Sequence, residues 1–216
     1  MSELKLILID PYPSLCVAWR EQFADLPNVE IVNGRFEELN AYDCMVSAAN
    51  SFGLMDGGVD AAITRFFGEA LMYRVQQRIV EEYLGEQPVG TSLIVETGHR
   101  RHPFVAHTPT MRVPMPIANT DHVYTAMWSM LLAVRRHNLH AEKRISVVAC
   151  PGLGTGVGQT PHDEAARQMS LAYRHYLKPI RTINWSFATL RQNAIGRGGD
   201  IALAPRKKIP AEADDE

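Results

Sequence analysis

Two glycine-rich loops, each entered from an apolar run, constrain this chain more than any other feature. The first loop (residues 51–57) follows Met45-Val46-Ser47-Ala48-Ala49-Asn50 and leads through Gly57-Gly58 to Asp60, on the first turn of a predicted helix. The second loop (residues 151–158) follows an apolar run that ends at Cys150, and it has glycine at every second position from 152 to 158. Glycine lets backbone amides approach an anion closely. Two such loops in one domain predict a ligand with more than one phosphate, held between them.

Apolar runs of strand length alternate with segments of helical spacing along most of the chain, which predicts an α/β protein whose mainly parallel sheet is flanked by helices. Ligands bind such sheets at the carboxyl ends of the strands, where both loops fall. The predicted strands are residues 4–9, 29–32, 44–48, 92–96, 104–107, 145–149 and 183–190. The predicted helices are residues 14–24, 57–67, 69–84 (which could continue the preceding one), 121–137 and 160–177.

Composition and charge exclude several classes of protein. The net charge of −2 gives no argument for nucleic acid or an acidic membrane, and the basic pairs such as Arg100-Arg101 are short enough to be solvated surface. Neither the cysteines nor the histidines have the spacing of metal ligands, so we expect no metal and no cofactor. No apolar run approaches the length of a membrane span, and we expect a cytoplasmic protein.

The second loop matches neither of the common phosphate-binding fingerprints. Val157 and Gln159 stand where the dinucleotide motif Gly-x-Gly-x-x-Gly needs its third glycine, and no Lys-Ser/Thr follows Gly158. Thr160-Pro161-His162-Asp163 predicts a helix start with Thr160 at the N-cap and Pro161 at N1. The alternative interpretation of the second loop is a flexible structural loop. For the first loop, the alternative is a tight turn at Gly57-Gly58 followed by a helix cap at Asp60. Successive amides entering a capped helix nevertheless favour an anion site.

The motifs Val46-Ser47-Ala48-Ala49-Asn50, Asp56-Gly57-Gly58-Val59-Asp60 and Cys150 to Gly158 resemble the two ligand loops of a macro domain, the ADP-ribose-binding module. The resemblance covers about residues 29–190. It implies a three-layer α/β/α sandwich with a mainly parallel, mixed central sheet. We expect one macro-like domain over residues 1–195, with residues 1–28 as an extra strand and helix, and a C-terminal tail over residues 196–216.

The resemblance implies a role for each loop. Asn50 would hydrogen-bond the distal ribose beside Ala49, and Asp60 would position or activate a water that attacks this sugar, which makes Asp60 and Asn50 the candidate catalytic residues. The backbone of the first loop and the helix start would contact the pyrophosphate and distal ribose, and the second loop would wrap the phosphates. These further ligand-binding candidates are Gly57, Gly58, Val59, Gly154, Thr155, Gly156, Val157 and Gly158.

Three positions depart from the family pattern. Arg35 stands where the family has an Asp that accepts a hydrogen bond from the adenine amine, and a guanidinium has no acceptor. Glu37, Glu38 or the backbone would then serve, or the base is not adenine. Ser47 replaces an Asn, and Asp56 replaces a Gly and brings a negative charge near the pyrophosphate.

The resemblance leaves three functions open. One is hydrolysis of ADP-ribosyl esters, on a protein or as O-acetyl-ADP-ribose. The second is a non-catalytic module that binds ADP-ribose, an ADP-ribosylated macromolecule or another nucleotide. The third is a phosphatase acting on ADP-ribose 1″-phosphate.

Four other residues are weaker candidates for the site. Trp185 and Phe187 could stack on a base, although core packing is the favoured interpretation. His107 is interpreted as a hydrogen-bonded residue at a strand end. Arg112 could reach the site from the segment after its strand.

Overall fold

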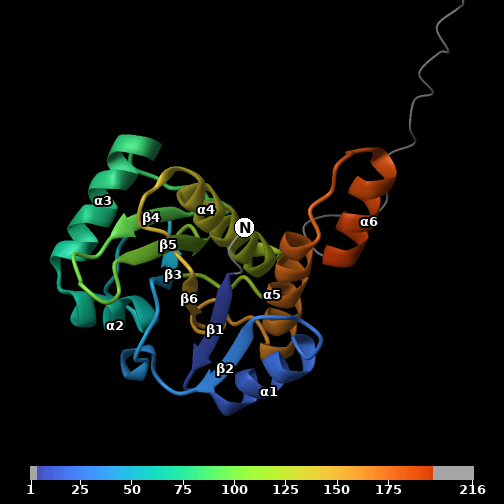
Figure 1. The fold of residues 1–216 in the computed structure, drawn as a ribbon, viewed down its shortest axis with the longest axis horizontal. Helices are drawn as coiled ribbons and strands as arrows, with labels where there is room; N and C mark the ends of the chain where they lie inside the picture. The colour runs from blue at the N-terminus through green and yellow to red at the C-terminus, as the bar shows by residue number, and fades with distance from the viewer. Residues whose placement is uncertain (1–3, 197–216) are drawn as a thin grey trace, which may run out of the picture.

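Short apolar runs form the central sheet, and those in its interior are mostly buried on both faces. The computed structural model describes residues 4–196, which form six strands and six α-helices (Figure 1). The strands are β1 (Lys5–Asp10), β2 (Val29–Asn33), β3 (Cys44–Asn50), β4 (Leu93–Glu96), β5 (Phe104–Met111) and β6 (Val147–Cys150). The helices are α1 (Pro13–Gln22), the 3₁₀ turn η1 (Phe36–Glu38), α2 (Gly58–Phe67), α3 (Ala70–Tyr83), α4 (His122–His140), α5 (His162–Leu177) and α6 (Trp185–Ile195).

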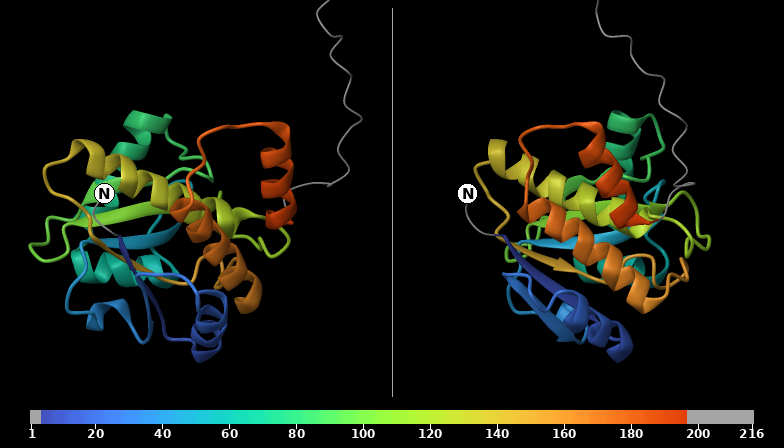
Figure 2. Two further views of the ribbon diagram at one scale, coloured as in Figure 1. Left: turned by 45° about the vertical axis from the view of Figure 1, so that its right-hand side comes forward. Right: turned by 90° about the vertical axis from the view of Figure 1, so that its right-hand side faces the viewer.

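The strand order is β2-β1-β6-β3-β5-β4, and every neighbouring pair is parallel except the antiparallel pair β4 and β5. One face of the sheet packs against α1, α4 and α5, and the other packs against α2 and α3, so the hydrophobic core has two layers. Figure 2 shows the sheet between these two sets of helices. The predicted three-layer sandwich with a mixed sheet is therefore confirmed. The carboxyl ends of β1, β2, β3, β5 and β6 all meet at one edge, as parallel pairing requires.

The predicted strand over residues 183–190 is wrong, because this segment contains the start of helix α6. The side chain of Asn184 accepts a hydrogen bond from the Phe187 amide at 2.9 Å and caps that helix. β6 is already paired on both sides, with β1 and with β3, so it offers no open edge to a further strand. Figure 1 shows α6 beside α5 and away from the sheet. The segment is also poorly buried, since Ile183 and Leu190 are mostly exposed.

The N-terminal strand takes an interior place in the sheet. Residues 1–28, predicted to be an extra strand and helix, form β1 and α1, and β1 lies second from the edge, between β2 and β6. Its residues Leu6 and Leu8 are fully buried, and α1 covers it against α5. The carboxyl end of β1, at Asp10, therefore reaches the same edge as both glycine-rich loops.

The remaining boundaries differ from the prediction by a few residues. β3 continues to Asn50, and β5 continues to Met111. Gly68, with φ of 91°, separates α2 from α3, so residues 57–84 form two helices. Helix α5 begins at His162 with Pro161 at the N-cap, so the predicted cap at Thr160 is wrong. The Thr160 amide instead donates to the Gly154 carbonyl at 3.0 Å and closes the second loop.

No helix within residues 4–196 is long and apolar enough to cross a membrane. In that same part of the chain, no group of three His, Cys, Asp or Glu side chains is placed to hold a metal ion. The predicted C-terminal tail lies outside the described residues, apart from Gly196, which ends α6.

Candidate functional site

A cavity of about 400 Å³ opens at the carboxyl edge of the sheet, between the two glycine-rich loops. The ends of β1, β2, β3 and β5, the first turns of α2 and both loops contribute to its wall. All the residues predicted to contact a ligand line it: Ala49, Asn50, Gly57, Gly58, Val59, Asp60, Gly154, Thr155, Gly156, Val157 and Gly158. The structure thus brings the two sequence motifs to one place, and their contacts with a ligand stay a prediction.

Asn50 holds the first loop in shape. Its Oδ1 accepts hydrogen bonds from the amides of Phe52 and Leu54 at 3.0 and 3.3 Å, and its Nδ2 donates to the Leu54 carbonyl at 2.8 Å. The side chain therefore has one N–H left for a ligand. Sequence reasoning assigned Asn50 to the ribose alone and missed this positioning role for the loop.

The start of α2 presents unshielded backbone to the cavity. Gly57 is the N-cap and has no side chain with which to cap the helix, so the first amides of α2 are not satisfied by a side-chain cap. A Cβ placed on Gly57 or Gly58 would meet nothing within 4 Å. Gly58 has φ of 54°, a conformation that favours glycine. The amides and dipole of this helix end can receive an anion.

Asp60 is a buried carboxyl group in the wall of the cavity. Only 5% of the residue is exposed, and the Ser47 hydroxyl donates a hydrogen bond to its Oδ1 at 2.7 Å. Burial raises the pKa of Asp60 to about 7, the Ser47 hydrogen bond opposes this rise, and the charge of Asp56 adds to it. A carboxyl group with a pKa near neutrality can accept a proton from water at the pH of a cell.

His107 lies next to this pair but does not line the cavity. It pairs with Ser47 across β5 and β3, it is fully buried, and its Nδ1 lies 2.7 Å from the Gln87 Oε1. Its Nε2 is buried and has no hydrogen-bond partner, so the predicted hydrogen-bonded state is right for one ring nitrogen only. Burial lowers the pKa of His107 to about 3, which keeps the ring neutral. His107 is therefore a packing residue behind the site.

The second loop is packed tightly against the rest of the protein. A Cβ on Gly152 would lie 2.5 Å from the Leu15 side chain, and one on Gly158 would overlap the Gly154 carbonyl and lie 2.9 Å from Ile117. Gly156 differs, because a Cβ there would meet nothing within 4 Å. Three of the four alternating glycines thus serve the packing of the loop, and only Gly156 is open toward solvent.

The end of β1 contributes residues that sequence reasoning missed. Asp10 is mostly buried, and its carboxylate accepts hydrogen bonds from the Tyr12 amide at 3.0 Å and the Gly152 amide at 3.1 Å. It ties β1 to the second loop and lines the cavity with Tyr12. The sequence signal for this position was Asp10-Pro11 directly after an apolar strand. The strand order is needed to place Asp10 beside the second loop and the cavity.

Two of the three positions that depart from the family pattern, Arg35 and Asp56, line the cavity, whereas Ser47 is fully buried behind it and contacts Asp60. Arg35 and Glu37 contribute to the wall, and the Glu38 carboxylate instead accepts a hydrogen bond from the Arg35 amide at 3.4 Å. Asp56 is exposed and faces the same cavity. Arg35 follows β2 at the position where the family has an Asp. Asp10, at the end of the neighbouring strand β1, supplies a carboxylate to the same cavity.

The weaker candidates lie elsewhere. Trp185 and Phe187 belong to α6 and do not line the cavity. Trp185 is 68% exposed, so the favoured prediction of core packing is wrong for it. Phe187 and Trp128 instead flank the guanidinium of Arg191, with ring centroids at 5.0 and 4.9 Å. Arg112 is exposed and forms an ion pair with Glu86 at 2.6 Å.

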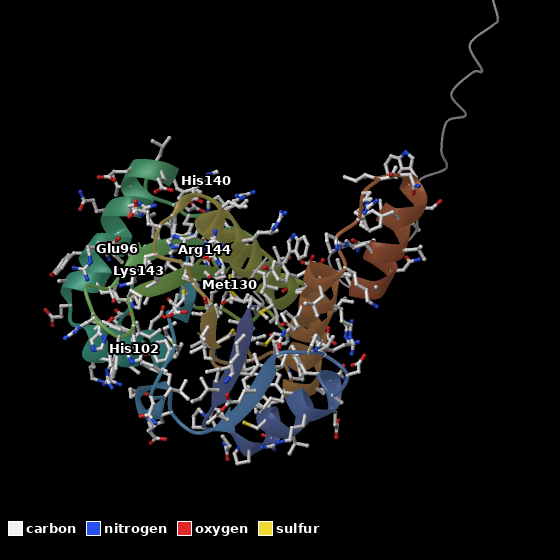
Figure 3. The ribbon with its side chains drawn as sticks, in the orientation of Figure 1. Glu96, His102, Met130, His140, Lys143 and Arg144 are labelled. Atoms are coloured by element: carbon white, nitrogen blue, oxygen red, sulfur yellow. The ribbon has the colours of Figure 1, made fainter. Side chains whose placement is uncertain are left out.

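A second, smaller hollow lies at the opposite end of the sheet. Its wall includes Glu96 at the end of β4, Arg100 from the β4–β5 connection and Lys143 from the segment before β6. Figure 3 labels Glu96 and Lys143, which lie close together there. Opposite charges share this hollow, and nothing in it matches the loop geometry of the first cavity.

Comparison with known proteins gives a consistent family. The family model described as "Macro domain" matches residues 46–169, a segment that runs from β3 through both loops and into α5. An uncharacterized protein of Aquifex aeolicus is 34% identical over 66% of this chain and 78% of its own length. A macro domain-containing protein of Streptomyces coelicolor is 31% identical over 66% of this chain and 80% of its own length.

Solved structures agree on the fold. The macrodomain of Mycobacterium tuberculosis DarG superposes with a TM-score of 0.55 at 18% identity, covering 66% of this chain and 87% of that one. The Oceanobacillus iheyensis macrodomain with ADP gives a TM-score of 0.55 at 22% identity, covering 76% of this chain and 87% of that one.

Proposed function

Because the chain belongs to the macro domain family, we propose that the cavity between its two glycine-rich loops binds ADP-ribose. The observation that carries this proposal is the facing arrangement of the α2 start and the second loop, both of which present backbone to one cavity. The solved Oceanobacillus iheyensis macrodomain holds ADP, and a mutant of it holds ADP-ribose. Here the pyrophosphate would lie between the amides of Gly58 and Val59 and those of the second loop, neutralised by backbone dipoles.

The two ends of the cavity suit the two ends of the ligand. At one end, Asn50 and Asp60 would meet the distal ribose. At the other end lie Asp10, Tyr12 and Arg35. An ionised carboxylate has about four acceptor positions, and Asp10 uses two of them for backbone amides, so a free position remains for the adenine amine. This supports adenine as the base despite Arg35.

Calorimetric titration with ADP-ribose tests the binding proposal, with ADP, AMP and a GDP-linked sugar as controls. We expect the tightest binding for ADP-ribose. Binding of the GDP-linked sugar in its place would show that Arg35 has changed the base. Absence of heat with every nucleotide would contradict the proposal.

Asp60 supports a second proposal, that the bound ADP-ribosyl ester is hydrolysed. A water molecule would attack the anomeric carbon C1″ of the distal ribose and form a new C–O bond. The bond from C1″ to the ester oxygen would break, its electron pair would leave with the carboxylate, and the proton of the water would pass to Asp60. A pKa of about 7 suits Asp60 to this step, and the Ser47 hydroxyl would hold the acceptor oxygen in place.

Product analysis separates the three functions that the family allows. Hydrolysis predicts ADP-ribose and a free carboxylic acid from an ADP-ribosylated glutamate peptide or from O-acetyl-ADP-ribose. Inorganic phosphate from ADP-ribose 1″-phosphate, without ester cleavage, would favour a phosphatase. Measurable affinity with no product at high protein concentration would leave a binding module.

A further inference from the structure

Exposed apolar side chains gather at the mouth of the cavity. We define the apolar rim as Leu54, Val113, Pro114, Met115 and Val157. The four of these that are large hydrophobic residues are between 46% and 58% exposed, which is unusual for a set of neighbours rather than single side chains. Leu54, Pro114 and Val157 also line the cavity, so the rim is continuous with the site.

Three segments are joined to form this rim. The Ser51 amide of the first loop donates to the Arg112 carbonyl at 3.0 Å, and the Ile117 amide donates to the Gly158 carbonyl of the second loop at 2.8 Å. Residues 112–117 therefore bridge the two loops, with Ile117 buried as an anchor. Two prolines in this bridge limit its freedom, so its apolar side chains are held at the mouth before any partner arrives.

Charge at the mouth favours a protein over a nucleic acid. Arg112 is the basic residue of the bridge and is paired with Glu86, while Asp56 adds an exposed acid to the cavity wall. The strand β6 runs away from Lys143 and Arg144 toward the second loop, so these cations lie at the far end of the molecule (Figure 3). Arg35 and Arg65 also line the cavity, but they come from the segment after β2 and from α2, so the rim itself adds no unpaired cation for the phosphates of a nucleic acid.

We propose that the apolar rim binds an apolar peptide segment next to the residue that carries the ADP-ribose. This inference rests on the proposed function, since it assigns the carrier of the nucleotide and not the nucleotide itself. The distal ribose would enter the cavity, and the flanking side chains of the carrier would pack on Val113 and Met115 outside it. The substrate class would be ADP-ribosylated proteins with apolar residues beside the modified one.

The test compares ADP-ribose, free and attached through a non-hydrolysable link to short peptides, in a fluorescence competition assay. One peptide has Leu and Val beside the modified residue, one has Ser and Gly there, and a third probe is an ADP-ribosylated oligonucleotide. We expect the apolar peptide to bind about tenfold more tightly than free ADP-ribose, a gain that a few buried side chains supply. The polar peptide and the oligonucleotide should bind no better than free ADP-ribose.

The variant V113S/M115S should remove this gain and leave the affinity for free ADP-ribose unchanged, since neither residue lines the cavity. The matched control is V80S/L139S, which changes two residues on α3 and α4 that are 60% and 63% exposed. This control should keep the gain.

Equal affinity for the two peptides would overturn the inference, and so would a preference for the oligonucleotide. An equal loss of free ADP-ribose binding in V113S/M115S would also overturn it, because the rim would then serve the nucleotide. If the unaltered protein does not bind free ADP-ribose, the proposed function fails first, and that result is distinct from the others.

Discussion

The two glycine-rich loops look alike in sequence, yet their glycines are needed for different physical reasons. In the second loop, a side chain on Gly152 or Gly158 would collide with Leu15, Ile117 or the loop itself. At the start of α2, a Cβ on Gly57 or Gly58 would point into open space. Gly152 and Gly158 of the second loop therefore let the protein pack on itself, whereas Gly57 and Gly58 at the start of α2 leave open space at the cavity. A glycine pattern predicts that other atoms lie close to the backbone. The structure is needed to tell whether those atoms belong to the protein or to a ligand.

Gly158→Ala gives the largest expected effect and tests the packing half of this comparison. The new Cβ would overlap the Gly154 carbonyl and press on Ile117, and backbone atoms cannot move aside cheaply. We predict a loss of about 3 kcal/mol in the free energy of unfolding, as overpacking against backbone costs. Denaturant unfolding measures it. A stability equal to that of the unaltered protein would show that the loop is loose and that the comparison is wrong.

Asp60→Asn tests whether the buried carboxylate in the cavity wall lowers the free energy of unfolding. Burial raises the pKa of Asp60 from 3.8 to about 7, so between these values the folded protein binds more protons than the unfolded chain. Stability therefore falls as the pH rises through this window, and the cost is full above pH 7. We predict that the stabilisation given by Asp60→Asn is greater by about 3 kcal/mol at about pH 8 than at about pH 5.

Thermal or denaturant unfolding at the two pH values checks this prediction. Asn keeps an oxygen that can accept the Ser47 hydrogen bond and removes the charge, so it is a matched replacement. A stability difference that does not change with pH would mean that Asp60 is not charged at a cost in the folded state.

Gly156→Ala sharpens the comparison from inside the second loop, because Gly156 is the glycine there with open space around its Cβ position. We predict that its stability stays within about 0.5 kcal/mol of the unaltered protein, as for an exposed substitution. Its affinity for ADP-ribose should fall by about tenfold, since a methyl group would stand between the loop and a phosphate. Calorimetry and unfolding of the same preparation give both values. Unchanged affinity would place the ligand away from this loop.

Arg112→Ala gives the smallest expected effect and tests the bridge between the loops. The ion pair with Glu86 is exposed on both sides, at 70% and 44% of the two side chains. Exposed pairs contribute little, so we predict a change in stability below about 0.5 kcal/mol. ADP-ribose affinity should not change. A loss of binding in this variant would bring Arg112 into the site after all.

Local patterns predicted most of the strands, both loops and the residues of the two loops that line the cavity, but not Asp10, which is also proposed to contact the ligand. These local patterns succeeded because an apolar run followed by glycine indicates where a strand ends, whatever the rest of the chain does. Asp10 and Tyr12 were missed because their place depends on which strand pairs with β6, which is a non-local choice. Residues 183–190 were predicted to be a strand, but the Asn184 side chain caps a helix there, and a cap of this kind does not show in hydrophobic pattern.

The catalytic half of the proposal depends on one buried carboxyl group, and the pH dependence of ester hydrolysis tests it most directly. Single-turnover release of ADP-ribose would be followed from about pH 5.5 to about pH 8.5 in the unaltered protein and in Asp60→Asn. We predict a rate that falls as the pH drops below about 7, where Asp60 gains its proton, and a rate in Asp60→Asn that is about 100-fold lower and independent of pH. An Asp60→Asn protein that binds ADP-ribose and keeps the full rate would contradict the assignment of Asp60 as the base.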